Sequence, residues 1–432
     1  MNQRQKAIEI FLAGVESVKP RNLIRNYVSI NNDILWISGT SFDLAAIKNI
    51  YAVGFGKASA AMSQALESVL GEKITGGCVI TKYGHSVPQQ IVEIIEAGHP
   101  VPDENGMRGT ERILSIVKNA GKDDLVICLI SGGGSALLAD VPNGCTLEDM
   151  RLLNSLLLKT GANITEINCI RKHLSKVKGG LLSKAAHPAR LVSLIISDVI
   201  GDPLDVIASG PTVPDPTTFT DAVSILKRYQ IESEIPNQIY KVLLDGMKDK
   251  QKETLKISDE VLLNTKNLVI GTNKLALEKA KEKAESFGYK PRIVTNTLEG
   301  DVTDVAGYII ESVKAAGKNS CLLFAGEPTV KVTGTGLGGR NQHFALIIAN
   351  LLKDMPDITV LAAGTDGTDG PTDATGAIVD SCTRENAYRL NLNMEQYIHN
   401  NDAYHFFKQE GGLIVTGPTQ TNVMDLIVTL IQ

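Results

Sequence analysis

Short apolar segments recur along the chain, and each ends at glycine or a small polar residue just before a helical pattern begins. They are residues 50–53, 125–130, 191–196, 268–270, 321–325 and 358–363. Near-continuous apolar strands that alternate with helices are typical of parallel sheets covered on both faces. Because ligands of such sheets lie beyond the carboxyl ends of the strands, we expect the functional site in the loops that follow these segments.

The chain of 432 residues is long enough for two domains. Residues 229–262 are more charged and less regularly apolar than their flanks, so the boundary is expected there. We therefore predict two α/β domains, residues 1–235 and 236–432. An amphipathic helix packed on the core is also predicted at the amino terminus. Its apolar positions are Ile8, Phe11, Leu12, Val15 and Val18.

Composition narrows the class of protein. The net charge is −5 and no basic run occurs, so there is no electrostatic footprint for nucleic acid. No segment resembles a signal peptide or is long and apolar enough to span a membrane. The six cysteines are scattered without paired spacing, as expected of buried thiols in a reducing compartment. We therefore expect a cytoplasmic protein, either a monomer or a homodimer.

Three consecutive glycines lie between a predicted strand and a helical pattern. Successive N–H groups at such a turn form an anion-binding concavity, which the positive end of the helix reinforces. A tight turn packed against a neighbour is the alternative, but it needs fewer glycines. We therefore predict a phosphate-binding turn. Its residues are Ser131, Gly132, Gly133, Gly134 and Ser135.

Lys57 follows Gly54 and Gly56 directly after the first apolar segment. The segment is not a P-loop, which needs a further upstream glycine, or a complete dinucleotide fingerprint, which needs glycine at Ser59. A lysine near the positive end of a helix is unfavourable unless an anion is bound there. We interpret Lys57 as a residue that contacts a transferring phosphoryl group. A solvent-facing lysine is the alternative.

A second glycine-rich segment, residues 334–339, ends at Arg340. The planar guanidinium of arginine suits a carboxylate or phosphate in two-point contact, and the glycines would let a ligand approach the backbone. A structural ion pair is the alternative. The basic residues between Arg171 and Lys178 supply local positive charge, although a solvated helix face is the more common explanation for such a run.

Acidic residues follow two of the predicted strands. Asp366, Asp369 and Asp373 lie in the glycine-rich loop after the last apolar segment, and Asp198 follows the third. Clustered carboxylates bind Mg²⁺, whereas their spacing here does not fit an EF-hand loop. We predict Asp198, Asp366 and Asp369 as metal ligands. Asp366 lies closest to its strand end and is the stronger candidate for the reaction centre, whereas a solvated loop is the alternative.

Together these motifs resemble the class II glycerate kinases, the ATP-dependent glycerate 2-kinases, some of which are labelled hydroxypyruvate reductases. Matching blocks run along nearly the whole chain. They begin at Gly54, Ala97, Ser131, Arg171, Ser197, Ala208, Gly338, Gly364 and Gly417. The resemblance implies a Rossmann-like domain with a parallel sheet and the triple-glycine turn. It also implies a smaller α/β domain, called MOFRL, with Arg340 and Asp366, and an active site in the cleft between the domains.

The activity that the resemblance implies is phosphorylation of the C2 hydroxyl of D-glycerate, a reaction of carbohydrate metabolism, with ATP as substrate and Mg²⁺ as cofactor. Lys57 and Arg340 match the family's catalytic lysine and arginine. Lys178, Asn341 and Asn422 are expected to contact substrate or phosphate. Positioning and charge neutralisation provide most of the catalysis in phosphoryl transfer. Replacing either catalytic residue with alanine is expected to remove most of kcat and leave the fold intact.

Two other classes of function stay open. An NAD(P)H-dependent hydroxypyruvate reductase would suit some family labels, although the dinucleotide fingerprint is incomplete. A non-catalytic anion-binding protein would use the same glycine turns without turnover. ADP release and NAD(P)H oxidation distinguish the three classes.

Overall fold

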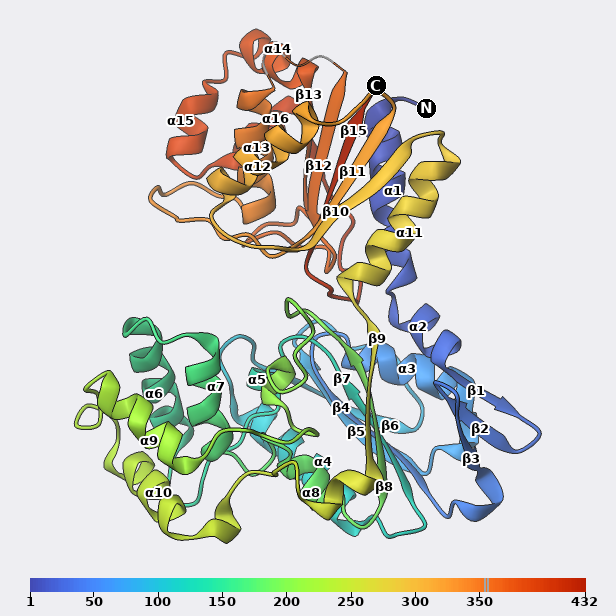
Figure 1. Ribbon diagram of the computed structural model, residues 1–432, viewed down its shortest axis with the longest axis vertical. Coiled ribbons are helices and arrows are strands. Elements are labelled where there is room, and N and C mark those ends of the chain that lie inside the picture. The colour runs from blue at the N-terminus through green and yellow to red at the C-terminus, as the bar shows by residue number, and fades with distance from the viewer. Residues whose placement is uncertain (353–354, 356) are drawn as a thin grey trace. The chain divides into compact units, whose positions relative to one another are not determined.

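The computed structural model describes residues 1–352, 355 and 357–432. The chain forms two compact units (Figure 1), which we name after their place in the sequence. The central unit is Leu23–Ile270. The terminal unit combines Met1–Asn22 with Gly271–Gln432. Each unit is built from a sheet and helices, so the predicted class of two α/β domains is confirmed.

A Rossmann-like sheet forms the core of the central unit, with strand order β6-β5-β4-β7-β8-β9. Its strands are β4 (Ile50–Phe55), β5 (Gly76–Lys82), β6 (Val92–Ala97), β7 (Leu125–Ile130), β8 (Arg190–Ile196) and β9 (Thr265–Gly271). β4 pairs in parallel with both β5 and β7, β5 with β6, and β7 with β8. The strand order reverses between β4 and β7, which is where doubly wound sheets bind their ligands.

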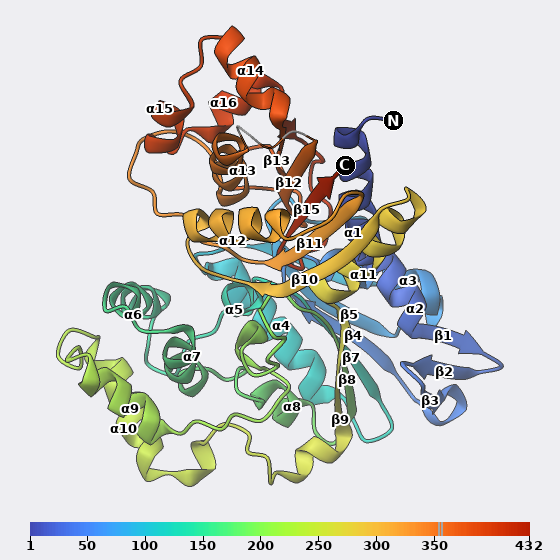
Figure 2. The same ribbon diagram turned by 45° about the horizontal axis from the view of Figure 1, so that its top comes forward.

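Helices cover both faces of this sheet. α3 (Ser59–Leu70) connects β4 to β5, whereas α4 (Glu104–Asn119) connects β6 to β7 in the opposite direction across the sheet. Right-handed crossovers therefore place these two helices on opposite faces. Figure 2 shows a further group of helices beside the sheet, where α6, α7, α9 and α10 bury an apolar cluster of their own. The remaining elements of this region are β1 (Val28–Asn31), β2 (Ile34–Ile37), β3 (Thr40–Asp43), α2 (Pro20–Tyr27), α5 (Gly134–Leu137), α6 (Leu147–Lys159), α7 (Ile164–His173), α8 (Leu181–Ala186), the 3₁₀ helix η3 (Ile207–Ser209), α9 (Phe219–Arg228) and α10 (Asn237–Lys248).

A mixed sheet forms the core of the terminal unit, with strand order β10-β11-β15-β12-β13-β14. Its strands are β10 (Lys290–Leu298), β11 (Ser320–Gly326), β12 (Ile358–Gly364), β13 (Gly376–Asp380), β14 (Leu413–Ile414) and β15 (Asp425–Ile431). β15 lies between β11 and β12 and is antiparallel to both. The expectation of a parallel sheet is therefore wrong for this unit, because the last strand of the chain returns between the two predicted strands.

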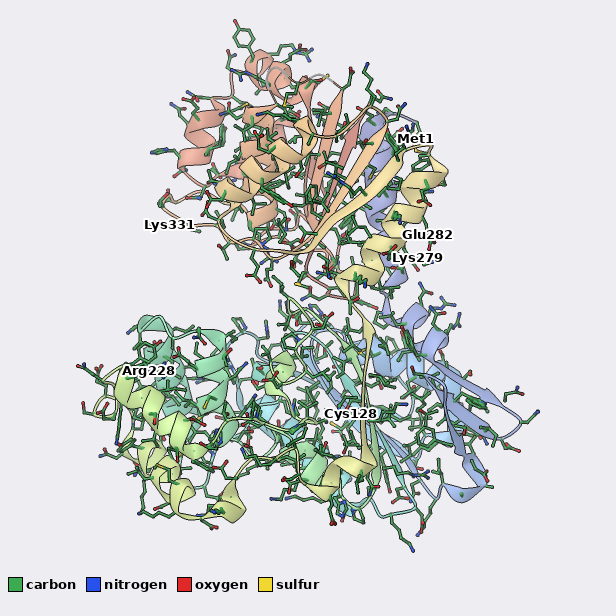
Figure 3. All side chains as sticks on the ribbon, in the orientation of Figure 1. Met1, Cys128, Arg228, Lys279, Glu282 and Lys331 are labelled. Carbon is green, nitrogen blue, oxygen red and sulfur yellow. The ribbon has the colours of Figure 1, made fainter. Side chains whose placement is uncertain are left out.

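Two layers of helices enclose this mixed sheet (Figure 1). α1 (Gln3–Ser17) and α11 (Asn273–Ser286) pack side by side on one face, and α13 (Arg340–Leu351) packs on the other with α12 (Val302–Lys314). On the outer side of α11, Lys279 and Glu282 form an ion pair at 2.8 Å (Figure 3). The other helices are α14 (Ser381–Arg389), α15 (Met394–His399) and α16 (Ala403–Glu410).

The amino-terminal helix is confirmed, but its buried stripe is shifted. Ile10 and Phe11 are fully buried, whereas the predicted core residue Leu12 is 41% exposed. The predicted domain boundary at 235/236 also differs from the boundaries of the two units. α1 packs on the terminal sheet, and α10 packs Ile239 and Leu243 into the helical cluster of the central unit, so each lies across the expected boundary.

The six cysteines form no disulfide. Four are buried, including Cys128 on β7 (Figure 3), and this confirms the expectation of buried thiols for most of them. Cys145 is half-buried, and Cys382 is exposed. Within the described residues, no helix is both long and apolar enough to cross a membrane.

Candidate active site

The loops after β4 and β7 are joined where the strand order of the central sheet reverses. The N–H of Lys57 donates to Gly132 O at 2.9 Å, and the N–H of Ala58 donates to Ser131 Oγ at 2.9 Å. Ser59, the first residue of α3, donates its hydroxyl to Gly56 O at 2.8 Å. These bonds hold Lys57 beside the triple-glycine turn at the carboxyl edge of the sheet.

Side chains from two other strand ends approach this turn closely. A β-carbon added to Gly132 would lie 1.8 Å from Asp198 Oδ2. One added to Gly133, whose φ is +80°, would lie 2.9 Å from His99 Nε2 and 3.3 Å from Lys57 Cγ. Only glycine fits such close approaches. The structure thus brings Lys57, Asp198 and the glycine turn together, as the sequence predicts, and adds His99.

Two lysines add positive charge near His99, which contacts the glycine turn. Burial, followed by the positive charges of Lys57 and Lys82, lowers the pKa of His99 to about 4. His99 follows β6, and Lys82 ends β5. Positive charge beside the backbone N–H groups of a strand-to-helix turn favours a bound anion. This edge of the sheet is therefore suited to an anion.

Two carboxylates hold Arg340 in the terminal unit. Asp425, at the start of β15, pairs in register with both Gly326 of β11 and Gly364 of β12. Arg340 donates from Nε to Asp425 Oδ2 at 2.5 Å and from Nη2 to Asp425 Oδ1 at 3.0 Å. Its Nη1 donates to Glu327 Oε1 at 2.8 Å. The guanidinium thus forms the structural ion pair that the sequence left open, and its contact with a ligand stays a prediction.

The charge of Arg340 is strongly favoured by this arrangement. Burial disfavours the charged guanidinium, but Asp425 and then Glu327 outweigh burial and raise the pKa of Arg340 above its usual value. Asp425 is almost completely buried, with 2% of its side chain exposed. A buried carboxylate is stable only while its partner remains. Arg340 therefore supplies the partner that the buried Asp425 carboxylate needs at the junction of the three strands.

Asp369 caps the helix that begins with Arg340. Its Oδ1 accepts the N–H of Asn341 at 3.0 Å, and its Oδ2 accepts the N–H and Nε2 of Gln342 at 2.8 and 3.0 Å. The residue is buried, and both oxygens face donors. The carboxylate satisfies the first N–H groups of α13, and this helix-capping role weighs against the prediction of a metal ligand at Asp369.

Asp366 lies in the same loop, near the end of β12. Its Oδ1 accepts the N–H and the hydroxyl of Thr368, both at 3.0 Å. A β-carbon added to Gly364 would lie 3.3 Å from Asp366 Oδ1 and 3.5 Å from Asp425 Oδ1. Two carboxylates therefore approach the end of β12, and Asp366 stays the predicted reaction-centre residue of this loop.

The glycine-rich segment 334–339 is held by protein groups instead of being open to a ligand. Asn401 Oδ1 accepts the N–H of Gly334 at 2.9 Å, and Asn400 O accepts the N–H of Gly336 at 2.9 Å. The same two glycines pack against the backbone of Asn400 and the side chain of Asp402. Their role is a close approach between two loops of the terminal unit.

The three remaining predicted site residues also have partners inside their units. Lys178 is buried, and its Nζ donates to Leu138 O at 2.7 Å and lies 3.5 Å from Asp140 Oδ1. Asn341 is buried, and its Nδ2 donates to Asp369 Oδ1 at 3.3 Å. Asn422 Oδ1 accepts the N–H of Met424 at 3.1 Å. These bonds give Lys178 and Asn341 structural contacts, and the expected contacts with substrate or phosphate stay predictions.

The cap at Asp369 leads to a pH prediction. Burial raises the pKa of Asp369 from 3.8 to about 6, against the opposing effect of its N–H donors. The folded state therefore binds this proton more tightly than the unfolded state does, and the stabilisation from protonation is lost as pH rises through about 4 to about 6. We expect thermal unfolding to show the wild type losing stability relative to Asp369→Asn across this range. The exposed Asp373→Asn variant is the control and should follow the wild type. A constant difference between the wild type and Asp369→Asn would contradict the prediction.

Sequence reasoning did not single out Asp425, Glu327 or His99. Asp425 directly precedes the apolar run 426–428, but an acid at a strand start becomes notable only once β15 is known to run antiparallel between two strand ends. Glu327 follows the predicted strand 321–325 and could have been found by the rule that identified Asp198. His99 could be identified only once the end of β6 was known to lie beside the glycine turn.

Comparison with known proteins identifies two family models along the chain. One is described as a domain of unknown function (DUF4147) and matches residues 6–244, and the MOFRL family matches residues 320–425. A glycerate 2-kinase of Pyrococcus horikoshii is 39% identical over 100% of this chain and 98% of its own length. A D-glycerate 2-kinase of Thermotoga maritima is 39% identical over 99% of this chain and 98% of its own. The solved structure of a glycerate kinase from Thermotoga maritima has a TM-score of 0.87 at 39% identity and covers 99% of both chains.

Proposed function

The chain belongs to the glycerate 2-kinase family, and we propose that it transfers the γ-phosphoryl group of ATP to the C2 hydroxyl of D-glycerate. The products are 2-phosphoglycerate and ADP. The protein is thus a phosphotransferase with an alcohol group as acceptor. The observation that carries this proposal is the full-length similarity to two glycerate 2-kinases, which includes both α/β units.

The geometry of the central unit supports phosphate binding. The turn from Gly132 to Ser135 presents backbone N–H groups at the switch point of a parallel sheet, beside Lys57 and the positive environment of His99. We assign the N–H groups to the ATP phosphates and Lys57 to the transferring phosphoryl group. Fixed donors stabilise the charge of such a group without reorganisation during the reaction.

The proposal also uses one carboxylate of the terminal unit. Asp366 is assigned to accept the proton of the C2 hydroxyl, which general-base catalysis requires as the phosphoryl group is transferred. Arg340 is assigned a positioning role, because its three bonds to Asp425 and Glu327 fix both carboxylates. Removing Arg340 would therefore disturb the reaction through these neighbours.

The donor groups fit Mg²⁺ in part. Mg²⁺ is usually held by one or two carboxylates together with substrate phosphates, and it would neutralise phosphate charge when bound with ATP. Asp198 is suited to this role because its carboxylate lies against Gly132 of the phosphate-binding turn. Asp366 is a second candidate ligand. Asp369 does not fit, because its oxygens accept bonds from α13. Among the described residues, no group of three or more His, Cys, Asp or Glu side chains forms a complete protein cage.

Substrate-dependent ADP release tests the proposed function. We expect the protein to release ADP from Mg-ATP when D-glycerate is present, and to release none when either substrate is omitted. Oxidation of NADH or NADPH by hydroxypyruvate without any ADP release would instead support the reductase. Binding of ATP without turnover would support a non-catalytic anion-binding protein.

A further inference from the structure

Helix α7 ends in three consecutive basic residues, and two of them have acidic partners. Lys172 Nζ lies 3.3 Å from Asp215 Oδ1, and His173 Nε2 lies 3.3 Å from Glu253 Oε2. Lys172 and His173 are buried, so the expected solvated face is wrong for them. Their partners anchor the end of α7. This anchoring fixes the position of the third basic residue, Arg171.

Arg171 differs from its two neighbours in having no counterion. It is half-buried, and its Nε donates to Asn154 Oδ1 at 2.9 Å. In the described part of the chain, no carboxylate oxygen lies within 4.0 Å of its guanidinium. Burial lowers the pKa of Arg171 below its usual value. Partial burial of an uncompensated charge is costly, so an anionic ligand would stabilise this position.

A second cation adds to the positive charge near Arg171. Lys178 is buried, and although Asp140 opposes the effect, burial and the charge of Arg171 lower its pKa. The carboxylate of Asp140 is already shared, because its Oδ1 also accepts the hydroxyl of Ser175 at 2.8 Å. Asp140 pairs with Lys178 and not with Arg171, so the charge of Arg171 leaves this region positive.

A chain of polar side chains connects the same face of α7 to the phosphate-binding turn. Asn168 lies three positions before Arg171, which places both on one face of the helix. Ser209 Oγ donates to Asn168 Oδ1 at 3.0 Å and lies 2.9 Å from the Oγ of Ser135, the last residue of the turn. Both α5 and α7 contact η3, the 3₁₀ helix that contains Ser209. A chain of hydrogen bonds thus runs from Asn168 of α7 through Ser209 to the turn.

We propose that Arg171 is a specificity-determining residue that binds the carboxylate of the acceptor substrate. This inference rests on the proposed function and names the part of the substrate that Arg171 recognises. Asn154 orients the guanidinium through Nε, and the two terminal nitrogens form a fork that matches a carboxylate. The phosphates are assigned to Lys57 and the N–H groups of the turn.

The test compares Arg171→Ala and Arg171→Lys in the full chain, with D-glycerate, ATP and glycerol as varied substrates. Glycerol has the C2 hydroxyl but no carboxylate. For Arg171→Ala we expect kcat/KM for D-glycerate to fall by about 100-fold, mainly through KM, because a polar recognition group is lost. The KM for ATP and the kcat/KM for glycerol should change less than about threefold. Arg171→Lys retains the charge but not the fork of two nitrogens. Its kcat/KM for D-glycerate should therefore lie between those of the wild type and Arg171→Ala.

Arg151→Ala is the matched control. Arg151 is a half-buried arginine of neighbouring α6 that donates to Pro102 O at 2.7 Å, and its loss should leave the KM for D-glycerate unchanged.

Arg171→Lys and calorimetric titration with D-glycerate keep the test valid if Arg171→Ala is unstable. An unchanged KM for D-glycerate in both Arg171 variants overturns the inference but not the proposed function. A raised KM for ATP alone assigns Arg171 to the nucleotide and also overturns it. If the wild type binds D-glycerate without turnover and the Arg171 variants do not, the inference stands and the proposed function fails.

Discussion

Replacing Lys57 with alanine is expected to lower kcat by about 10³-fold, the loss typical of removing one charged group that stabilises a phosphoryl-transfer transition state. The side chain of Lys57 lies against Gly133 in the phosphate-binding turn. Its backbone N–H, which joins the loops after β4 and β7, remains in the variant. The free energy of unfolding should therefore change by less than about 1 kcal/mol. Steady-state kinetics with D-glycerate and denaturant unfolding of the full chain measure the two effects.

Lys48 provides the control for this prediction. Lys48 precedes β4, whereas Lys57 follows it, so the two lysines lie near opposite ends of the same strand. Lys48→Ala removes an exposed charge of the same kind and should retain wild-type kcat. Turnover of Lys57→Ala near the wild-type rate would exclude Lys57 from the chemistry.

Replacing Arg340 with alanine is expected to lower both stability and activity. The variant leaves Asp425 buried without its partner, and breaking a buried pair in this way costs about 3 kcal/mol. Because Arg340 is 33% exposed, we expect the smaller loss of about 2 kcal/mol. Activity should fall because Asp425 and Glu327 are no longer fixed. The sequence-based expectation of an intact fold is thus revised for Arg340 but kept for Lys57.

A double-mutant cycle separates these contributions. Asp425→Ala removes the buried carboxylate, so Arg340→Ala should cost less stability in that background than in the wild type. Denaturant unfolding of the four proteins gives the coupling energy between the two residues. Equal stability losses in the two backgrounds would show that Arg340 does not stabilise the protein through Asp425.

Much of the fold could be predicted from local sequence patterns. The six apolar segments coincide with strands because they are continuous and end at glycine or small polar residues. Strand order and direction depend on long-range pairing, which local patterns do not contain. The antiparallel insertion of β15 therefore changed the expected terminal sheet. For the same reason, α1 belongs to the terminal unit although it begins the chain.

The candidate site shows the same limit. The sequence could predict that Lys57, Asp198 and the glycine turn lie close together, because each follows a strand of one parallel sheet. The partners of Arg340 and Asp369 could not be predicted in this way. Asp425 is far from Arg340 in the sequence, and the first turn of α13 is far from Asp369. A carboxylate that caps a helix and one that binds a metal look alike in a sequence. Only the N–H groups facing Asp369 distinguish the two roles.

The most direct test of the central claim is the identity of the phosphorylated product. The protein is incubated with Mg-ATP and D-glycerate, and enolase is added with or without phosphoglycerate mutase. Transfer to the C2 hydroxyl gives 2-phosphoglycerate, so enolase should consume the product at once without the mutase. A product that enolase consumes only when the mutase is present would be 3-phosphoglycerate and would contradict the assignment as a glycerate 2-kinase.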